Sequence, residues 1–254
     1  MKFYDEFLRI NKIKILIIIR LGSKRLKNKA KLKINNTSLI EILIKRLLKK
    51  FNRNNVIICT SKKSSSFFFK KIKKDYKLNI FFGDEENIFK RILDCKKKYN
   101  FNHFVRITGD NPLTDVNLIN KISKKHIKNK NDYTFTEGLP SGMKPEIFSI
   151  NALKQCYKKA RDPHSSEYLT YFFKRNEFKY SSIKIKKKYP NQDHLTITID
   201  RKTDFLKLKR LINKEGIYLS SSKIIKYLNE KKIYKTNRNS SFKLKTKKYD
   251  VRFK

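Results

Sequence analysis

The 254-residue chain has no tryptophan and only three cysteines, and it lacks several motifs that would assign a function at once. The cysteines are odd in number, widely separated and without Cys-x-x-Cys spacing, so neither a disulfide framework nor a zinc site is indicated. The four histidines show no metal-ligand spacing either. A Walker-type GxxxxGK[ST] loop is absent, which excludes the P-loop nucleotide-binding proteins.

Long apolar runs are also missing. The first run, residues 15–19, is far shorter than the roughly 20 residues that a membrane-spanning helix needs. It is also shorter than the apolar core of a secretory signal. We therefore expect no membrane insertion and a cytoplasmic location.

Acidic residues are scarce, with 22 Asp and Glu against 64 Lys and Arg, which gives a formal charge of +42. Such an excess usually points to nucleic-acid binding. Here, however, the basic residues are spread along the chain and are mostly lysine, as expected when the coding DNA is rich in A and T. The charge predicts non-specific attraction of anions at low salt, and no specific nucleic-acid partner.

Short apolar runs alternate with segments of helical periodicity along the first half of the chain. Strands separated by helices predict an α/β fold with a mostly parallel, twisted sheet flanked by helices. We expect strands at 15–19, 56–60, 78–82 and 104–108, and helices at 39–48, around residue 72, at 88–98 and at 116–123.

The second half continues with strands and helices in mixed order, and no internal repeat is present. We expect strands at 133–136, 146–148, 180–185 and 195–199, and helices from about 149 and 165 and at 203–212 and 221–229. The main domain is expected to span residues 1–230. Residues 231–254 are polar and basic with little periodicity, which predicts a tail or a docked arm.

The segment 20–29 is the most informative one. A buried strand stops and releases a short loop with one glycine (Gly22), one hydroxyl (Ser23) and five basic side chains, among them Arg20, Arg25 and Lys29. This combination favours a polyanionic ligand, and a nucleoside triphosphate fits it best. A merely solvated loop is the alternative in so basic a chain, but the two arginines stand out among lysines and favour phosphate binding.

Two aspartates follow predicted strands. Asp110 lies in a Gly-Asp-x-Pro turn after strand 104–108, and Asp200 closes strand 195–199. Carboxyl ends of strands meet at one edge of a parallel sheet, where ligands bind. Each aspartate alone could be a helix cap or a turn residue. Two convergent carboxylates that face a triphosphate would form a Mg²⁺ site.

Five segments in this order resemble motifs of the sugar cytidylyltransferases. The resemblance is to the branch of spore coat polysaccharide biosynthesis, which is similar to the enzymes that activate acylneuraminate and deoxy-octulosonate sugars with CTP. The segments are RLGSKRLKNK (20–29), RITGDNPLTD (106–115), PSGMKPEIF (140–148), SEYLT (166–170) and TIDRKTD (198–204).

The resemblance implies a nucleotide-diphospho-sugar transferase fold with a small dimerisation or acceptor lobe at about 134–190. Relatives often form dimers through this lobe, so a homodimer is one assembly that the resemblance suggests, and the oligomeric state stays open. It implies a cytidylyltransferase that moves CMP from CTP to a sugar, an acidic keto-sugar by analogy, and releases pyrophosphate for surface polysaccharide biosynthesis. The partners are then CTP and the sugar, and the cofactor is Mg²⁺.

The resemblance also assigns roles to residues of this chain. The pattern is broken at Lys27 and Asn28, where relatives usually carry Pro-Gly, and at Tyr168, where they usually carry histidine. The nucleotide would be bound by Arg20, Gly22, Ser23, Arg25, Lys29, Thr60 and Ser61, catalysis would depend on Arg25, Lys29 and Asp110, the metal would be held by Asp110 and Asp200, and the sugar would contact Arg106, Glu146 and Glu167.

Other classes of function stay open at this point. A nucleic-acid-binding protein on an α/β scaffold would explain the charge and would show a basic stripe on one face. An inactive relative or a glycosyltransferase could use the same sheet. A glycosyltransferase typically carries an Asp-x-Asp metal motif in one loop, and this sequence has none.

Overall fold

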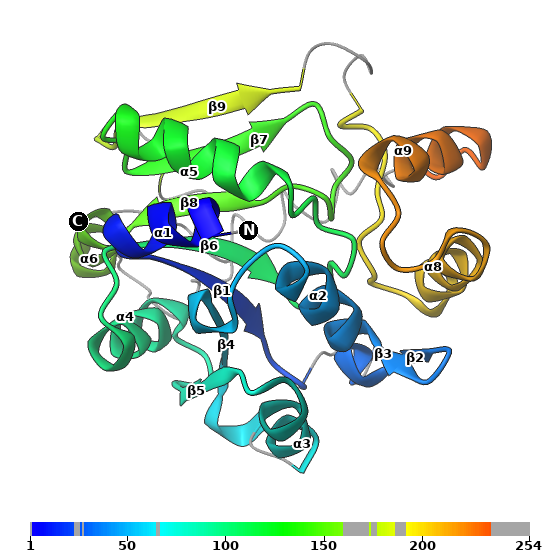
Figure 1. Ribbon diagram of the computed structural model, residues 1–254, viewed down its shortest axis with the longest axis horizontal. Coiled ribbons are helices and arrows are strands. Elements are labelled where there is room, and N and C mark those ends of the chain that lie inside the picture. Colours follow the sequence, from blue (N-terminus) through cyan, green and yellow to red (C-terminus); the bar gives the residue numbers. More distant parts are fainter. Residues whose placement is uncertain are drawn as a thin grey trace.

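A seven-stranded sheet forms the centre of the molecule in the computed structural model, which describes residues 2–22, 26, 28–64, 67–159, 173, 177–185 and 192–234. Helices cover both of its faces (Figure 1). The order across the sheet is β5-β4-β1-β6-β8-β7-β9. The strands are β1 (Ile13–Ile19), β4 (Val56–Ser61), β5 (Asn79–Gly83), β6 (His103–Thr108), β7 (Tyr133–Glu137), β8 (Glu146–Ser149) and β9 (Tyr180–Lys184).

The sheet is mostly parallel, as predicted, and one strand is reversed. Strands β5, β4, β1 and β6 run parallel, whereas β8 is antiparallel to both of its neighbours, β6 and β7. Strand β9 is again parallel to β7. The central strand β1 reads as an almost continuous apolar run because helices cover both faces of a parallel sheet.

Alternating side chains of the strands build two cores. On one face, Ile15, Ile17, Val105 and Ile107 pack with side chains of α1 (Lys2–Ile10), α2 (Leu39–Leu48), α3 (Phe67–Tyr76) and α5 (Leu118–Lys128). On the other face, Leu16, Ile18, Phe104 and Phe148 pack with α4 (Ile88–Tyr99) and α6 (Ile150–Lys159). The α2 helix starts at Ser38, which forms a capping box with Glu41 as the sequence predicts.

A third apolar cluster lies beside the sheet. It joins α8 (Lys202–Glu215) and α9 (Ser221–Glu230) to a hairpin of β2 (Lys33–Ile34) and β3 (Thr37–Ser38), to α2 and to residues 195–199. Figure 1 shows α8 and α9 at one side of the molecule. Arg46 of α2 fixes them there, because its buried guanidinium donates hydrogen bonds to the carbonyls of Ile217 (2.6 Å) and Leu219 (3.3 Å). Burial lowers the pKa of this arginine.

Most predicted strands and helices are confirmed to within a few residues, and one strand is wrong. Residues 195–199 form no strand, and the bridges that they make with other described residues are isolated ones, Ser141 with Thr196 and Leu195 with Tyr234. Neighbouring segments offer single contacts there instead of a continuous ladder. The sequence analysis missed α1 and the β2–β3 hairpin.

The domain boundaries stay a prediction. Within the expected lobe of 134–190, the described strands β7, β8 and β9 belong to the main sheet. The helix expected from about 165 and most of the tail (235–254) lie outside the described residues. Among the helices that are described, none is both long enough and apolar enough to cross a membrane.

Candidate active site

The carboxyl ends of the parallel strands bring distant residues to one edge of the sheet. In the register, Ile18 lies beside Thr108, and Ile19 lies beside Thr60. The basic loop therefore starts at Arg20 next to the turn that carries Asp110. This is the edge at which open α/β sheets bind their ligands.

Lys29 joins the two aspartates that the sequence analysis singled out. Its ammonium group forms an ion pair with the carboxylate of Asp110, and its Nζ lies 3.7 Å from Oδ1 of Asp200. It also donates a hydrogen bond of 3.1 Å to the carbonyl of Ile199. Asp110 and Asp200 are 90 residues apart in sequence, and they converge at one edge of the sheet as predicted. The shared contact with Lys29 was not predicted.

Local backbone features hold these three side chains in place. Lys29 begins a 3-10 turn, Lys29–Lys31, after Asn28 in the left-handed region (φ 53°). Gly109 donates to the carbonyl of Ile18 at 3.0 Å, and a Cβ at this position would lie 2.9 Å from atoms of Ile19. Only glycine lets the Asp110 turn close this tightly against β1.

Asp200 is held by the start of α8. The backbone N–H groups of Asp200 and Arg201 both donate to Oδ2 of Asp204, at 3.1 and 2.9 Å. The segment before Asp200 is pinned by Gly142, which has φ +91° and would place a Cβ 2.8 Å from the backbone nitrogen of Thr198. Any side chain there would push the segment before Asp200 away from the loop that carries Gly142.

The donor set at this point suits a hard divalent cation. Two carboxylates and a backbone carbonyl surround the Lys29 ammonium. Mg²⁺ is commonly bound by one or two carboxylates together with substrate phosphates and water. The residues present therefore fit such an ion, although the described residues contain no cluster of three or more acidic, histidine or cysteine side chains.

Arg106 and Glu146, predicted on the sugar side, are cross-strand neighbours of β6 and β8. Arg106 donates to Oε2 of Glu146 through Nε (2.9 Å) and Nη2 (2.5 Å), and the Tyr133 hydroxyl donates to Oε1 at 2.6 Å. Burial alone would lower the pKa of Arg106, but the adjacent Glu146 carboxylate outweighs it and raises that pKa. Both oxygens of Glu146 thus have a donor, and the pair is fixed as a unit.

Thr60 and Ser61 end β4 beside the basic loop, and both are fully buried. The Ser61 hydroxyl lies 2.9 Å from the hydroxyl of Ser64, which accepts a hydrogen bond of 3.0 Å from the backbone N–H of Leu21. Ser61 is therefore linked through Ser64 to the start of the basic loop. The Thr60 hydroxyl has no hydrogen-bond partner among the described residues.

Several predicted residues cannot be placed. Ser23, Arg25 and Glu167 lie outside the described residues. The same holds for Lys27 and Tyr168, two positions at which the sequence departs from the family pattern. Gly22 is described and exposed, and a Cβ built on it would meet no atom of the described residues within 4 Å, its chain neighbours aside. Their roles stay predictions.

Sequence reasoning missed Ser64, Tyr133 and Arg91. Arg91 of α4 is buried and donates to the carbonyls of Asp84 and Glu85, both at 2.7 Å, which fixes the loop after β5. Burial lowers its pKa, and repulsion from Arg20 contributes to the shift. An arginine among the lysines of α4 was a usable signal, whereas nothing in the spacing distinguished Ser64 or Tyr133.

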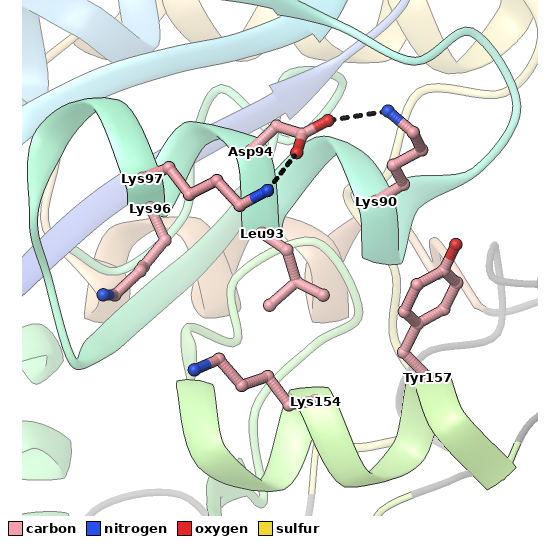
Figure 2. Close-up of a pocket in the computed structure, with 7 residues that line it drawn as sticks. All are labelled: Lys90, Leu93, Asp94, Lys96, Lys97, Lys154 and Tyr157. Atoms are coloured by element: carbon pink, nitrogen blue, oxygen red, sulfur yellow. Dashed lines mark hydrogen bonds and ion pairs between the residues drawn. The ribbon is translucent and has the colours of Figure 1, made fainter.

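Two pockets lie at the α4 side of the molecule. One, of about 310 Å³, is formed between α4, with Leu93 and Asp94, and α6, with Lys154 and Tyr157 (Figure 2). The other, of about 440 Å³, borders the ends of β4 and β5 around Gly83. Neither of these two pockets is lined by Asp110 or Asp200, and the contacts of the aspartate pair define the candidate site.

Comparisons with known proteins agree on one family. A model described as Cytidylyltransferase matches residues 14–238. An uncharacterized protein of Methanocaldococcus jannaschii is 32% identical over 196 residues, or 76% of this chain and 81% of that protein. The spore coat polysaccharide biosynthesis protein SpsF of Bacillus subtilis is 26% identical over 87% of this chain and 95% of its own length.

Solved structures share the fold. A cytidylyltransferase of Leptospira borgpetersenii superposes with a TM-score of 0.79 at 25% identity, over 87% of this chain and 94% of that one. A CMP:2-keto-3-deoxy-manno-octonic acid synthetase, solved in complex with CTP, gives a TM-score of 0.61 at 12% identity, over 80% and 99%. The predicted α/β nucleotidyltransferase fold is thereby confirmed.

Proposed function

The chain belongs to the cytidylyltransferase family, and on that premise we propose that it activates a sugar by transferring CMP from CTP, with release of pyrophosphate. One observation carries the proposal: Asp110 and Asp200 converge on Lys29 at the sheet edge where the basic loop begins. The likeness to SpsF, named for spore coat polysaccharide biosynthesis, favours surface polysaccharide as the destination of the product.

We assign the triphosphate to the basic loop. The sequence of this loop supplies positive charge from Arg20, Arg25 and Lys29 and a hydroxyl from Ser23. Gly22 adds exposed backbone, and Lys29 contacts both aspartates. Arginine binds phosphate oxygens in a bidentate way, so Arg20 and Arg25 orient the chain of phosphates. Arg25 and Lys29 stabilise the charge that gathers on the departing pyrophosphate.

Thr60 and Ser61 have an indirect role in this proposal. Both are buried, and Ser61 is linked through Ser64 to the backbone of Leu21. They therefore shape the wall against which the nucleotide lies. Positioning of this kind contributes to catalysis because it preorganises the groups that meet the phosphates.

Mg²⁺ is the cofactor that we propose, held by Asp110 and Asp200. A fold relative has been solved in complex with manganese, which supports a divalent ion in this fold. When bound, such an ion neutralises phosphate oxygens and lowers the pKa of the attacking hydroxyl. The chain's own residues hold the α-phosphorus in line with that hydroxyl, the new P–O bond forms, and the bond between the α- and β-phosphates breaks.

The sugar would contact Arg106, Glu146 and Glu167, and an acidic keto-sugar is the acceptor class that we propose. The name of the keto-deoxy-octonic acid synthetase with the same fold supports this class. The Arg106 and Glu146 pair offers a rigid, net-neutral surface on which hydroxyl groups of a sugar can bind. We further propose a homodimer that acts in the cytoplasm.

The test is a screen of CTP, UTP, ATP and GTP against keto- and aldose sugars for Mg²⁺-dependent release of pyrophosphate. We expect release only with CTP and an acidic keto-sugar. Asp110→Asn should lower kcat by roughly 10³-fold, the scale on which loss of a charge-stabilising group acts. Asp75→Asn, which removes an exposed carboxylate of α3, is the matched control and should keep full activity. Full turnover by Asp110→Asn would disprove the assignment.

A further inference from the structure

The Lys29 ammonium occupies the position that a divalent ion needs. It pairs with Asp110, lies 3.7 Å from Asp200, and donates to the carbonyl of Ile199. The side chains are well shielded, with only 14% of Lys29 and 12% of Asp200 exposed. By contrast, the side chain of Lys71, which pairs with Asp75 along α3, is 61% exposed.

Electrostatics explains why a cation resides between these aspartates. Two carboxylates that share a partly buried site repel each other unless a positive charge lies between them. Lys29 supplies that charge within the protein itself. A metal ion that used the same oxygens would meet the ammonium at short range, and the two positive charges would repel.

The same lysine belongs to the basic loop that faces the triphosphate. Its ammonium is a point charge on a flexible stem and can exchange one anionic partner for another without movement of the fold. The phosphates of a bound nucleotide offer it a second set of anionic oxygens. The two carboxylates are then left with an unbalanced negative charge that attracts a divalent ion.

We propose that Lys29 is a resident cation that couples metal binding to nucleotide binding. Without nucleotide it neutralises Asp110 and Asp200 and excludes the metal ion; with nucleotide it moves to the phosphates and opens the site. The inference rests on the proposed function, since it takes the ligand of the loop to be a nucleoside triphosphate. It makes Lys29 the residue that sets the order of binding.

The test measures Mn²⁺ binding to the nucleotide-free protein by electron paramagnetic resonance of free Mn²⁺. We expect weak binding by the wild type and at least tenfold tighter binding of one ion by Lys29→Met. The double variant Lys29→Met/Asp110→Asn should lose this gain. Lys29→Arg, which keeps the charge, and Lys71→Met, which exposes a single carboxylate, should bind Mn²⁺ as weakly as the wild type.

Equal or weaker Mn²⁺ binding by Lys29→Met would overturn the proposal. Lys29→Met could have a lower melting temperature than the wild type. In that case, a melting temperature that Mn²⁺ restores supports the proposal, and one that Mn²⁺ leaves unchanged contradicts it. Pyrophosphate release by the wild type is measured separately. If the wild type releases no pyrophosphate, the proposed function is refuted. The Mn²⁺ measurement uses nucleotide-free protein and does not depend on that result.

Discussion

A buried pair of histidines predicts how the stability of this protein depends on pH. His126 is fully buried; its Nε2 lies 3.1 Å from Nδ1 of His103, and its Nδ1 lies 3.0 Å from the hydroxyl of Thr134. Burial, together with repulsion from His103, lowers the pKa of His126 from 6.5 to about 3. The folded protein therefore holds this imidazole neutral.

The sign of the effect follows from where the proton binds. Below pH 6.5 the unfolded chain takes up a proton on this histidine and the folded chain does not, so acid favours unfolding. The contribution of neutral His126 to the free energy of unfolding is fully present above pH 6.5, and it is lost as the pH falls toward 3. Each pH unit in this window costs about 1.4 kcal/mol, so the fall from pH 7.5 to pH 5 costs about 2 kcal/mol.

Urea unfolding at pH 7.5 and at pH 5 measures this difference. His126→Leu removes the titrating group, so we expect its free energy of unfolding to fall by about 2 kcal/mol less than that of the wild type over the same interval. His194→Leu, which removes an exposed histidine, is the matched control for the loss of one imidazole. Equal losses in the wild type and in His126→Leu would refute the reasoning.

Two further predictions concern the basic loop. Gly22→Ala should leave the melting temperature unchanged because its Cβ meets no atom of the described residues within 4 Å beyond its chain neighbours. It should nevertheless raise the KM for CTP by about tenfold, or about 1.4 kcal/mol of lost contact, if phosphate lies against this backbone; an unchanged KM would contradict that placement. Ser64→Ala removes the acceptor of the Leu21 N–H, so we expect a loss of about 1–3 kcal/mol in urea unfolding and a raised KM for CTP; unchanged stability would contradict this account.

The alternation of strands and helices was predictable because the parallel sheet is buried on both faces. Its strands are apolar runs, and the helix at 39–48 carries a capping box that fixes its first residue. The antiparallel direction of β8 was not predictable, because the apolar pattern of a strand does not indicate whether it runs parallel or antiparallel to its neighbours. Residues 195–199 carry the same alternation as a strand, and only the absence of a continuous neighbour keeps them out of the sheet.

For the site, sequence order located the aspartates but not their partner. Asp110 and Asp200 follow extended apolar segments, and strand ends on one edge converge. Lys29 could be assigned to phosphate from its loop, but its contact with both carboxylates depends on the left-handed turn at Asn28 and on the close approach at Gly109. Such contacts arise from three segments at once, and no single segment encodes them.

The choice between arginine and lysine carries structural information in this chain. Lysine supplies most of the positive charge and mainly lies on the surface, whereas Arg46 and Arg91 are buried and Arg106 is half-buried, and each donates at least two hydrogen bonds to carbonyl or carboxylate oxygens. A planar fork of donors meets such oxygens in a fixed geometry, and an ammonium cannot replace it. Lys29 is the informative exception, because a partly buried lysine among carboxylates suits a charge that has to move. A rigid guanidinium would lock the aspartate pair, while an ammonium on a flexible stem can leave it when a nucleotide arrives.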